Sequence, residues 1–212
     1  APWLLVYTLF RGAFHEGWMP DNYFGRMIVP RWQRPGLSAK LLSRRLLRTQ
    51  ALPDLAYCLR GTWYGPDWSP LRPRALRRHV FAEDEAAIVK LNGSARGEGV
   101  WRIARAGFDP AALAARGEPV LVLPVRQHPD LAALSPDAVA TLRLTTVKPA
   151  GGPAELRAVY LRVGRTGEAV IRSAAGLRVA VDAATGRLGA GMAQADWRVL
   201  PAHPDTGLCP AG

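Results

Sequence analysis

Lys90 stands directly before a loop that holds three glycines, Gly93, Gly97 and Gly99. Glycine lets a backbone approach a ligand closely and turn several N–H groups towards one anion. The lysine adds positive charge at the base of the loop, and Arg96 adds another charge within it. Together these residues favour a loop that closes over the phosphates of a nucleotide.

An ordinary β-hairpin explains the same glycines. Apolar runs lie on both sides of the loop, at residues 88–89 and 100–103, which predicts strand, loop, strand. The loop matches neither common phosphate motif, because it lacks Gly-Lys-Ser/Thr before a helix and Gly-x-Gly-x-x-Gly at the start of one. Taken alone, the stretch is better interpreted as a hairpin.

The overall composition is that of a folded chain without disulfides. With 212 residues and 49% hydrophobic content it suits one medium domain or two small lobes. Cys58 and Cys209 lie far apart without metal-ligand spacing, which favours a reducing compartment, the cytoplasm. No apolar run reaches the ~18 residues that span a bilayer. The apolar residues 1–10 lack the features of a signal peptide and are predicted to begin a packed helix or strand.

The net charge of +11 comes mostly from arginine, and carboxylates are sparse before position 80. Such an excess can bind nucleic acid or an anionic substrate. Trp63, Tyr64 and Trp68 lie among these arginines, and aromatic side chains beside basic residues can stack on the bases of a nucleic acid. A solvated basic face is the alternative that we favour.

The first third of the chain predicts few regular elements. Pro20, Pro30 and Pro35 break residues 11–36. Aromatic side chains are expected to pack this segment onto the body: Phe14, Trp18, Tyr23, Phe24 and Trp32. Ser38 is a predicted N-cap for a helix over 39–49, with Lys40 in its first turn as a possible plain surface lysine. Residues 61–80 are expected to form a connector, with a turn at 65–70 and a basic run at 72–79.

The later part predicts more strands. Asp109 and Pro110 open a helix over 111–116, and residues 120–125 form a buried strand or hinge. A further helix is predicted to begin at Ser135. Strands are expected over 141–147, 156–163, 169–171 and 177–181, and the turn at 182–188 leads into another. The result is two β-rich lobes joined at residues 120–125.

Two such lobes, with a lysine and a glycine loop in the smaller one, describe a nucleotide clamp. The chain resembles the ATP-grasp superfamily, in particular its sugar-transfer associated group, which is related to alpha-L-glutamate ligases. The resemblance covers most of the chain and is strongest over residues 86–207. Its motifs stand in the expected order: Val89–Leu91 with Gly93–Val100, Gln127–Pro129, Thr141–Thr146, Val181–Gly186 and His203–Gly207.

The resemblance implies an α+β ATP-grasp fold in which two β-rich lobes clamp ATP. Residues 1–79 would form a helical or irregular N-terminal segment, 80–119 the small lobe with the glycine loop, and 120–212 the large lobe. The family continues beyond this point to a strand ending in Glu-x-Asn, so the large lobe is expected to be incomplete at Gly212.

The resemblance also implies residue roles. Lys90 would contact the α- and β-phosphates, and Lys40 would match an earlier ATP-contacting lysine, although Ala39 replaces the usual aspartate before it. The loop residues that would close over the phosphates are Gly93, Ser94, Arg96, Gly97 and Gly99. The hinge backbone at Leu121 and Leu123 would hold the adenine.

Arg143 lies in the Thr-Leu-Arg motif, where a cation could steady the transferred phosphoryl group. An ion pair with a neighbouring acidic side chain is the alternative for this residue. The implied reaction joins a carboxylate to an amine of a small metabolite or peptide. ATP, with Mg²⁺, would first convert the carboxylate to an acylphosphate, and the amine would then attack it to give an amide.

Three departures keep a non-catalytic binding protein open as an alternative. Val122 and Leu123 stand where the family has an acidic pair for the ribose hydroxyls, and residues 172–176 lack the family's Asn. No Glu-x-Asn occurs, so no metal ligand is assigned. Asp182 and Asp205 are interpreted as turn caps. His128 and His203 are interpreted as structural loop histidines.

Overall fold

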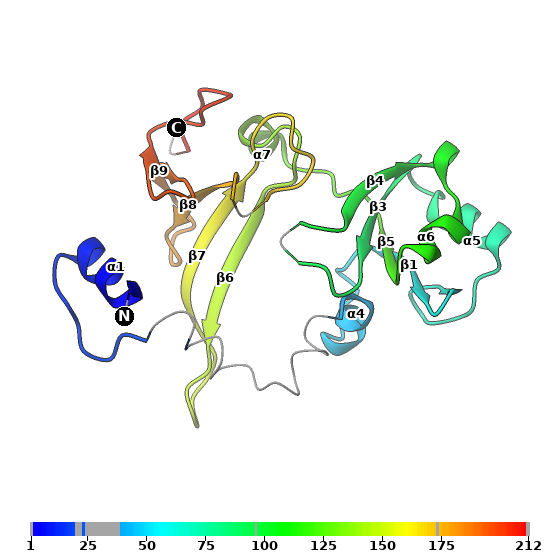
Figure 1. Cartoon of the computed structure of the whole chain (residues 1–212), viewed down its shortest axis with the longest axis horizontal. Coiled ribbons are helices and arrows are strands. Elements are labelled where there is room, and N and C mark those ends of the chain that lie inside the picture. Colours follow the sequence, from blue (N-terminus) through cyan, green and yellow to red (C-terminus); the bar gives the residue numbers. More distant parts are fainter. Residues whose placement is uncertain (1, 20–22, 24–38, 96, 173, 211–212) are drawn as a thin grey trace.

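The computed structural model describes residues 2–19, 23, 39–95, 97–172 and 174–210. In this part of the chain two antiparallel five-stranded sheets form from consecutive regions of sequence, with short helices packed beside them (Figure 1). Short helices lie between some of the strands in sequence, but every strand pair in this part of the chain is antiparallel, which is compatible with the α+β class predicted from the sequence.

The first sheet has the strand order β2-β1-β5-β3-β4. Its strands are β1 (Asp54–Leu59), β2 (Thr62–Tyr64), β3 (Ala86–Leu91), β4 (Val100–Ala104) and β5 (Pro119–Val122). The β1–β2 hairpin turns on Arg60 and Gly61, whose φ angles of 49° and 79° are those of a tight two-residue hairpin loop. Because β5 lies between β1 and β3, residues far apart in sequence meet in the middle of the sheet.

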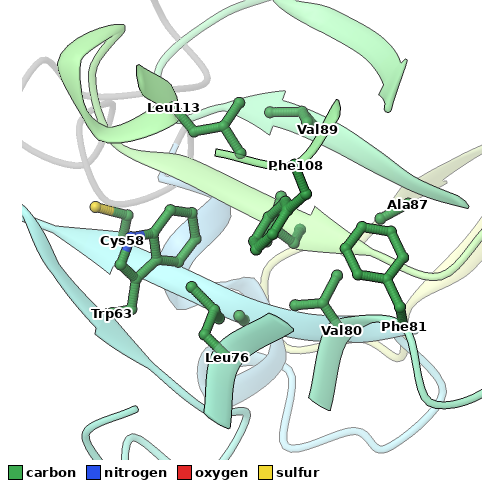
Figure 2. Close-up of a cluster of buried hydrophobic side chains, with 11 residues drawn as sticks. Cys58, Trp63, Leu76, Val80, Phe81, Ala87, Val89, Phe108 and Leu113 are labelled. Carbon is green, nitrogen blue, oxygen red and sulfur yellow. The ribbon is translucent and has the colours of Figure 1, made fainter. Parts of the chain in front are cut away.

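One face of this sheet packs against the helices α5 (Pro73–Val80) and α6 (Pro110–Ala115). Figure 2 shows the buried cluster, in which Phe108 lies between Val89 on one side and Leu76 and Val80 on the other, and the ring of Phe108 packs edge-on against Phe81. Asp109 begins α6 as predicted, because its Oδ1 accepts hydrogen bonds from the N–H groups of residues 111 and 112. This cluster is the main core of the first sheet.

The opposite face receives a short 3-10 turn, η1 (Lys40–Leu42), followed by α4 (Ser43–Leu46). Leu41 is buried there against Tyr57, Val120 and Val122. Side chains alternate between the faces of a strand, so Lys90 shares this face with Ile88 while Val89 points into the core of Figure 2. Lys40 and Lys90 thus lie on the same side of the sheet.

The second sheet has the order β10-β9-β8-β7-β6. Its strands are β6 (Thr141–Val147), β7 (Glu155–Val163), β8 (Leu177–Val181), β9 (Leu188–Ala193) and β10 (Val199–Leu200). The helix α7 (Pro129–Leu134) covers part of one face, where Leu134 packs with Leu161 and Leu177. The predicted strands over 141–147 and 177–181 are confirmed at the same bounds.

Several local predictions are wrong. The helix expected over 39–49 is instead the pair η1 and α4, and the basic run at 72–79 forms α5, whose Leu76 and Val80 share one helical face and enter the core. Ser135 does not begin a helix. The helix in this region is α7, which begins at Pro129 and ends at Leu134, so Ser135 is its C-cap. Residues 169–171 form no strand.

Residues 1–79 were predicted to form a separate N-terminal segment. Two strands of the first sheet, β1 and β2, and most of the helix α5 that packs against it come from this stretch. The sheet therefore spans residues 54–122, and the predicted boundaries at 79/80 and 119/120 fall inside it. Pattern reasoning missed β1 although its six residues are mostly apolar and a Gly-containing turn follows them.

Residues 2–11 form α1 (Pro2–Arg11), which confirms a helix at the start of the chain. The expected packing is wrong, because no described side chain of α1 is buried and Leu9 is 73% exposed. Trp18 contacts the rings of Tyr7 and Phe14, so the aromatic residues pack onto α1 itself. The predictions for Phe24, Trp32, Ser38 and the breaks at Pro20, Pro30 and Pro35 lie outside the described residues.

None of the helices in the described part of the chain has the length and apolar character needed to span a bilayer.

The buried cluster in Figure 2 should contribute strongly to the stability of the first sheet, and substitution can test this. We expect Leu76→Ala to lower the free energy of unfolding by about 2–5 kcal/mol, because the side chain is fully buried and its loss leaves a cavity. Leu142→Ala is the matched control, since this leucine on β6 is 58% exposed and should change stability by no more than about 0.5 kcal/mol. Urea unfolding monitored by tryptophan fluorescence measures both, and equal effects would contradict the assignment of the core.

Candidate functional site

The glycine loop, residues 92–99, joins β3 to β4 and confirms the predicted strand, loop, strand. Leu91 N donates to Gly99 O at 2.8 Å and closes its base. A Cβ atom on Gly99 would lie 3.1 Å from Ser94 Oγ, and its φ of 66° also favours glycine. Among the described residues, no acceptor pairs with the N–H groups of Gly93, Ala95 or Gly97. These donors are available to a ligand.

Lys40 lies at the base of the glycine loop. Its Nζ donates to Leu91 O at 2.8 Å, to Ser94 Oγ at 3.2 Å and to Ser94 O. Ser94 Oγ in turn donates to Leu91 O at 2.8 Å. An ammonium group has three hydrogens, and three acceptors of the loop surround this one. Lys40 therefore fixes the conformation of the loop, a role that the sequence did not predict.

Lys90 lies close enough to Lys40 to affect its protonation. Burial lowers the pKa of Lys40 below its ordinary value, and repulsion from Lys90 lowers this pKa further. In the described part of the chain neither lysine forms an ion pair with a carboxylate, and the Lys90 ammonium has no hydrogen bond. The pair leaves positive charge that no described group neutralises.

Arg102 adds a third cation to the same face of the sheet. It lies on β4 directly opposite Ile88, and residues opposite each other in an antiparallel pair project to one side. Its side chain is exposed. Arg102 was not among the predicted site residues, although the alternation of Val100, Arg102 and Ala104 with Trp101 and Ile103 indicated its side of the strand.

The outer part of the glycine loop touches the second sheet. A Cβ atom on Gly97 would lie 2.9 Å from Val170 Cγ1 and 4.0 Å from Arg172 Cγ, and φ of Gly97 is 86°. Figure 1 shows the loop between β3 and β4 extending from the first sheet towards the second. Gly97 is thus the point where the β7–β8 connection, residues 164–176, meets the loop.

The predicted hinge lies at the other end of β3. Leu121 pairs with both Ala56 and Val89, and its side chain is fully buried in the core. Leu123 N donates to Pro53 O at 2.9 Å. Leu123 also lines a pocket of about 390 Å³. The other lining residues are Pro53, Glu83, Asp84, Pro124, Val125 and Arg126.

Glu83 and Asp84 bring two carboxylates to this pocket from the turn before β3. The resemblance implies an acidic pair on the hinge strand itself, where this chain has Val122 and Leu123. Only the folding of residues 83–84 against 123–126 reveals the carboxylates, so no local motif could have indicated them. Asp84 Oδ1 also accepts a hydrogen bond from Ala86 N at 2.9 Å, which fixes the turn.

Arg143 lies on β6, in the other sheet, opposite Tyr160. Its side chain is exposed, and no acidic group among the described residues pairs with it. The structure thus brings together Lys40, Lys90 and the glycine loop and places Arg143 on a separate element. Arg96 lies outside the described residues.

The remaining acidic and histidine predictions can be placed. Asp182 Oδ1 accepts from Thr185 N at 2.7 Å, which confirms a turn cap. Asp205 Oδ2 accepts from Thr166 N at 2.9 Å, so it caps the turn at 165–168, and the carboxylate also binds the Arg165 guanidinium at 2.7 and 2.6 Å, which holds the pKa of this carboxyl well below the usual range. His203 is buried and its Nε2 lies 2.9 Å from Gly164 O, a structural role.

His128 caps α7, with its Nδ1 3.4 Å from Asp130 N, which confirms a structural role here as well. Within the described ranges, no group of three or more His, Cys, Asp or Glu side chains could hold a metal ion. One carboxylate oxygen, Glu168 Oε2, is buried without a hydrogen-bond partner among these residues.

The structure removes part of the support for nucleic-acid binding. Trp63 is buried in the core, and the ring of Trp68 stacks on Tyr57 at 5.2 Å. Arg77, one of the arginines near them, donates to the carbonyl oxygen of Arg105 at 2.7 Å. Base stacking needs exposed aromatic faces, and Trp63 does not offer one.

No family model matches the sequence, and no curated protein matches it. The assignment to the ATP-grasp superfamily therefore stays a prediction from the ordered motifs.

The proximity of the two lysines has a measurable consequence. We expect Lys90→Met to raise the pKa of Lys40 part of the way to its ordinary 10.5, because the repulsion disappears while burial, the larger cause, remains. Titration of the lysine ε-carbon signals by NMR measures it, and Lys148→Met is the control that should leave Lys40 unaffected. An unchanged pKa in Lys90→Met would show that the two ammonium groups are not neighbours.

The same pKa shift fixes the sign of a pH dependence. Between the lowered pKa of Lys40 in the folded chain and 10.5, the unfolded chain binds more protons, so this group's contribution to the free energy of unfolding rises with pH. Lys40→Met should remove that rise, and unfolding by urea at a series of alkaline pH values tests it.

Proposed function

We propose that the chain binds ATP at the glycine loop and is an ATP-dependent carboxylate–amine ligase of the ATP-grasp type. The observation that carries this proposal is the convergence of Lys40 and Lys90 on one glycine loop with no described carboxylate to neutralise them. Neighbouring like charges repel, and a bound anion relieves the repulsion. The unpaired loop N–H groups supply hydrogen-bond donors for the same anion.

The spacing along β3 supports a nucleotide rather than a small free anion. The pairs Leu91–Pro119 and Ile88–Val122 place Leu123 one residue beyond Ile88, about four residues from the base of the glycine loop. At about 3.4 Å per residue this separation is roughly 14 Å. An extended nucleoside triphosphate can cover it, with its base in the Leu123 pocket and its phosphates at the loop.

The Leu123 pocket has groups that suit a nucleoside. Its volume of about 390 Å³ lies in the range of small-molecule sites. Glu83 and Asp84 can accept hydrogen bonds from ribose hydroxyls, the role that an acidic pair on the hinge performs in the family. Because Leu123 N already donates to Pro53 O, the base would be held by packing and by groups other than this N–H.

The described residues fit Mg²⁺ only if the nucleotide contributes ligands. Mg²⁺ in ATP sites is held by one or two carboxylates together with phosphate oxygens. Glu168 provides a buried carboxylate oxygen without a hydrogen-bond partner, two residues before the Val170 that touches Gly97. Glu168 would therefore hold the ion. When bound, Mg²⁺ neutralises charge on the phosphates.

The proposed reaction needs positioning and charge stabilisation more than covalent help from the chain. Lys90 would contact phosphate oxygens, while Lys40 keeps the loop in place and contributes charge. A substrate carboxylate would attack the terminal phosphorus, which gives an acylphosphate and ADP. An amine would then displace phosphate and form the amide. Arg143 is proposed to stabilise the transferred phosphoryl group.

A non-catalytic nucleotide-binding protein is the second candidate. It is favoured by the lack of a metal-binding cluster in the described part of the chain. It shares the binding site but predicts no production of ADP when carboxylate and amine substrates are added. ADP release in the presence of a pool of amino acids separates the two candidates.

Thermal unfolding tests the shared binding step. A ligand that binds only the folded chain stabilises it, by about 2.7 kcal/mol at a hundred times its Kd, so Mg·ATP should raise Tm. Lys90→Ala should abolish most of this rise, because among the described lysines beside the loop Lys90 is the one whose ammonium is not already hydrogen-bonded to it. Lys148→Ala carries the same change in charge and should keep the rise. No shift with wild-type protein would overturn the proposal.

A further inference from the structure

We propose that Arg172, in the β7–β8 connection, binds the terminal phosphate and makes the site selective for a triphosphate over a diphosphate. This inference rests on the nucleotide site proposed above and names a residue to which neither the ordered motifs nor the predicted strands gave a role. Its basis is the contact between the glycine loop and the connection of residues 164–176.

The contact places Arg172 at the outer end of the loop. The ideal Cβ position of Gly97 lies 4.0 Å from Arg172 Cγ and 2.9 Å from Val170 Cγ1. Lys40 binds the opposite end, at Leu91 and Ser94. A phosphate chain that starts near the lysines and follows the loop outward therefore ends beside Arg172.

The Arg172 side chain is available for such a contact. It is exposed, and its guanidinium forms no hydrogen bond or ion pair with any described residue. Two arginines near it are engaged: Arg165 is bound by Asp205, and Arg162 donates to the carbonyl oxygen of Ile171 at 3.2 Å. A guanidinium suits a terminal phosphate because two parallel N–H groups can bind two of its oxygens.

The backbone that carries Arg172 is held in place. Its carbonyl oxygen accepts from Gly176 N at 2.8 Å, and the preceding Ile171 is buried. At the start of the connection, Gly164 N donates to Ser135 Oγ at 2.9 Å and Gly167 N donates to Asp137 Oδ2 at 2.7 Å. A fixed backbone reduces the conformational entropy lost when the side chain binds a ligand.

Triphosphate selectivity follows from the position of Arg172 in the β7–β8 connection. Lys90 and the glycine loop belong to the first sheet, and in the proposed site they contact the inner phosphates, which ATP and ADP share. Only the terminal phosphate reaches the outer end of the loop. Loss of Arg172 should thus weaken ATP more than ADP, whereas loss of Lys90 should weaken both.

Titration calorimetry with Mg²⁺ and either ADP or a non-hydrolysable ATP analogue tests the proposal. We expect Arg172→Ala to weaken the analogue by about tenfold or more, as loss of a charge-assisted hydrogen bond does, and to change ADP affinity by less than about threefold. Arg187→Ala is the matched control. This exposed arginine lies in the β8–β9 turn, and the substitution removes the same charge.

A second variant changes the loop side of the contact between the glycine loop and the β7–β8 connection. Gly97→Ala places a Cβ atom 2.9 Å from Val170 Cγ1 and forces a residue with a side chain into positive φ, so the contact between the loop and the β7–β8 connection must rearrange. It should reproduce the selective loss for the analogue. The inference is overturned if Arg172→Ala weakens both nucleotides equally, weakens neither, or behaves like Arg187→Ala. Wild-type protein that binds neither nucleotide overturns the proposed function itself.

Discussion

The contact of the Lys40 ammonium with the base of the glycine loop is the interaction on which the rest of the site depends. It joins the 3-10 turn η1 to residues 51 to 54 positions later in the sequence. Each hydrogen bond from a charged donor contributes about 1.5–3 kcal/mol, while burial and the nearby Lys90 still lower the pKa of this ammonium. The same contact lets Leu41 pack against Val120 and Val122. One lysine thereby positions both the loop and the turn beside it.

Because of this contact, Lys40 and Lys90 are available to a ligand to different extents. Lys40 has its three hydrogens directed at loop acceptors, so it cannot bind a phosphate without giving up one of them. Lys90 has no such acceptor among the described residues and can bind an anion directly. The charge of Lys40 still acts on that anion, because a partly buried charge is screened less than an exposed one. The resemblance implied a phosphate contact for Lys90 and, despite Ala39 in place of the usual aspartate, an ATP contact for Lys40; the structure gives the two lysines different positions.

The sequence predicted what local patterns determine. The β3–loop–β4 unit, the Asp109 cap and the strands β6 and β8 follow from apolar runs, turn residues and a capping carboxylate within a few positions. The helix α5 was missed because Pro73 and four basic residues hide the Leu76–Val80 pair. The Lys40 contact and the carboxylates at the Leu123 pocket join residues tens of positions apart, and no local pattern determines such pairs.

The surroundings of the three loop glycines help to distinguish a plain β-hairpin turn from a phosphate-binding loop. Gly93 has open space around its Cβ position and needs glycine only for its φ of 75°, and Gly99 has a tight neighbour within the loop itself. Any hairpin of this shape would require both. Gly97 differs, because the side chain nearest its Cβ position is that of Val170, in the connection between β7 and β8. A hairpin turn by itself has no need of that contact. The unneutralised lysines lie at one end of the loop and this contact at the other, an arrangement that the proposed phosphate site uses.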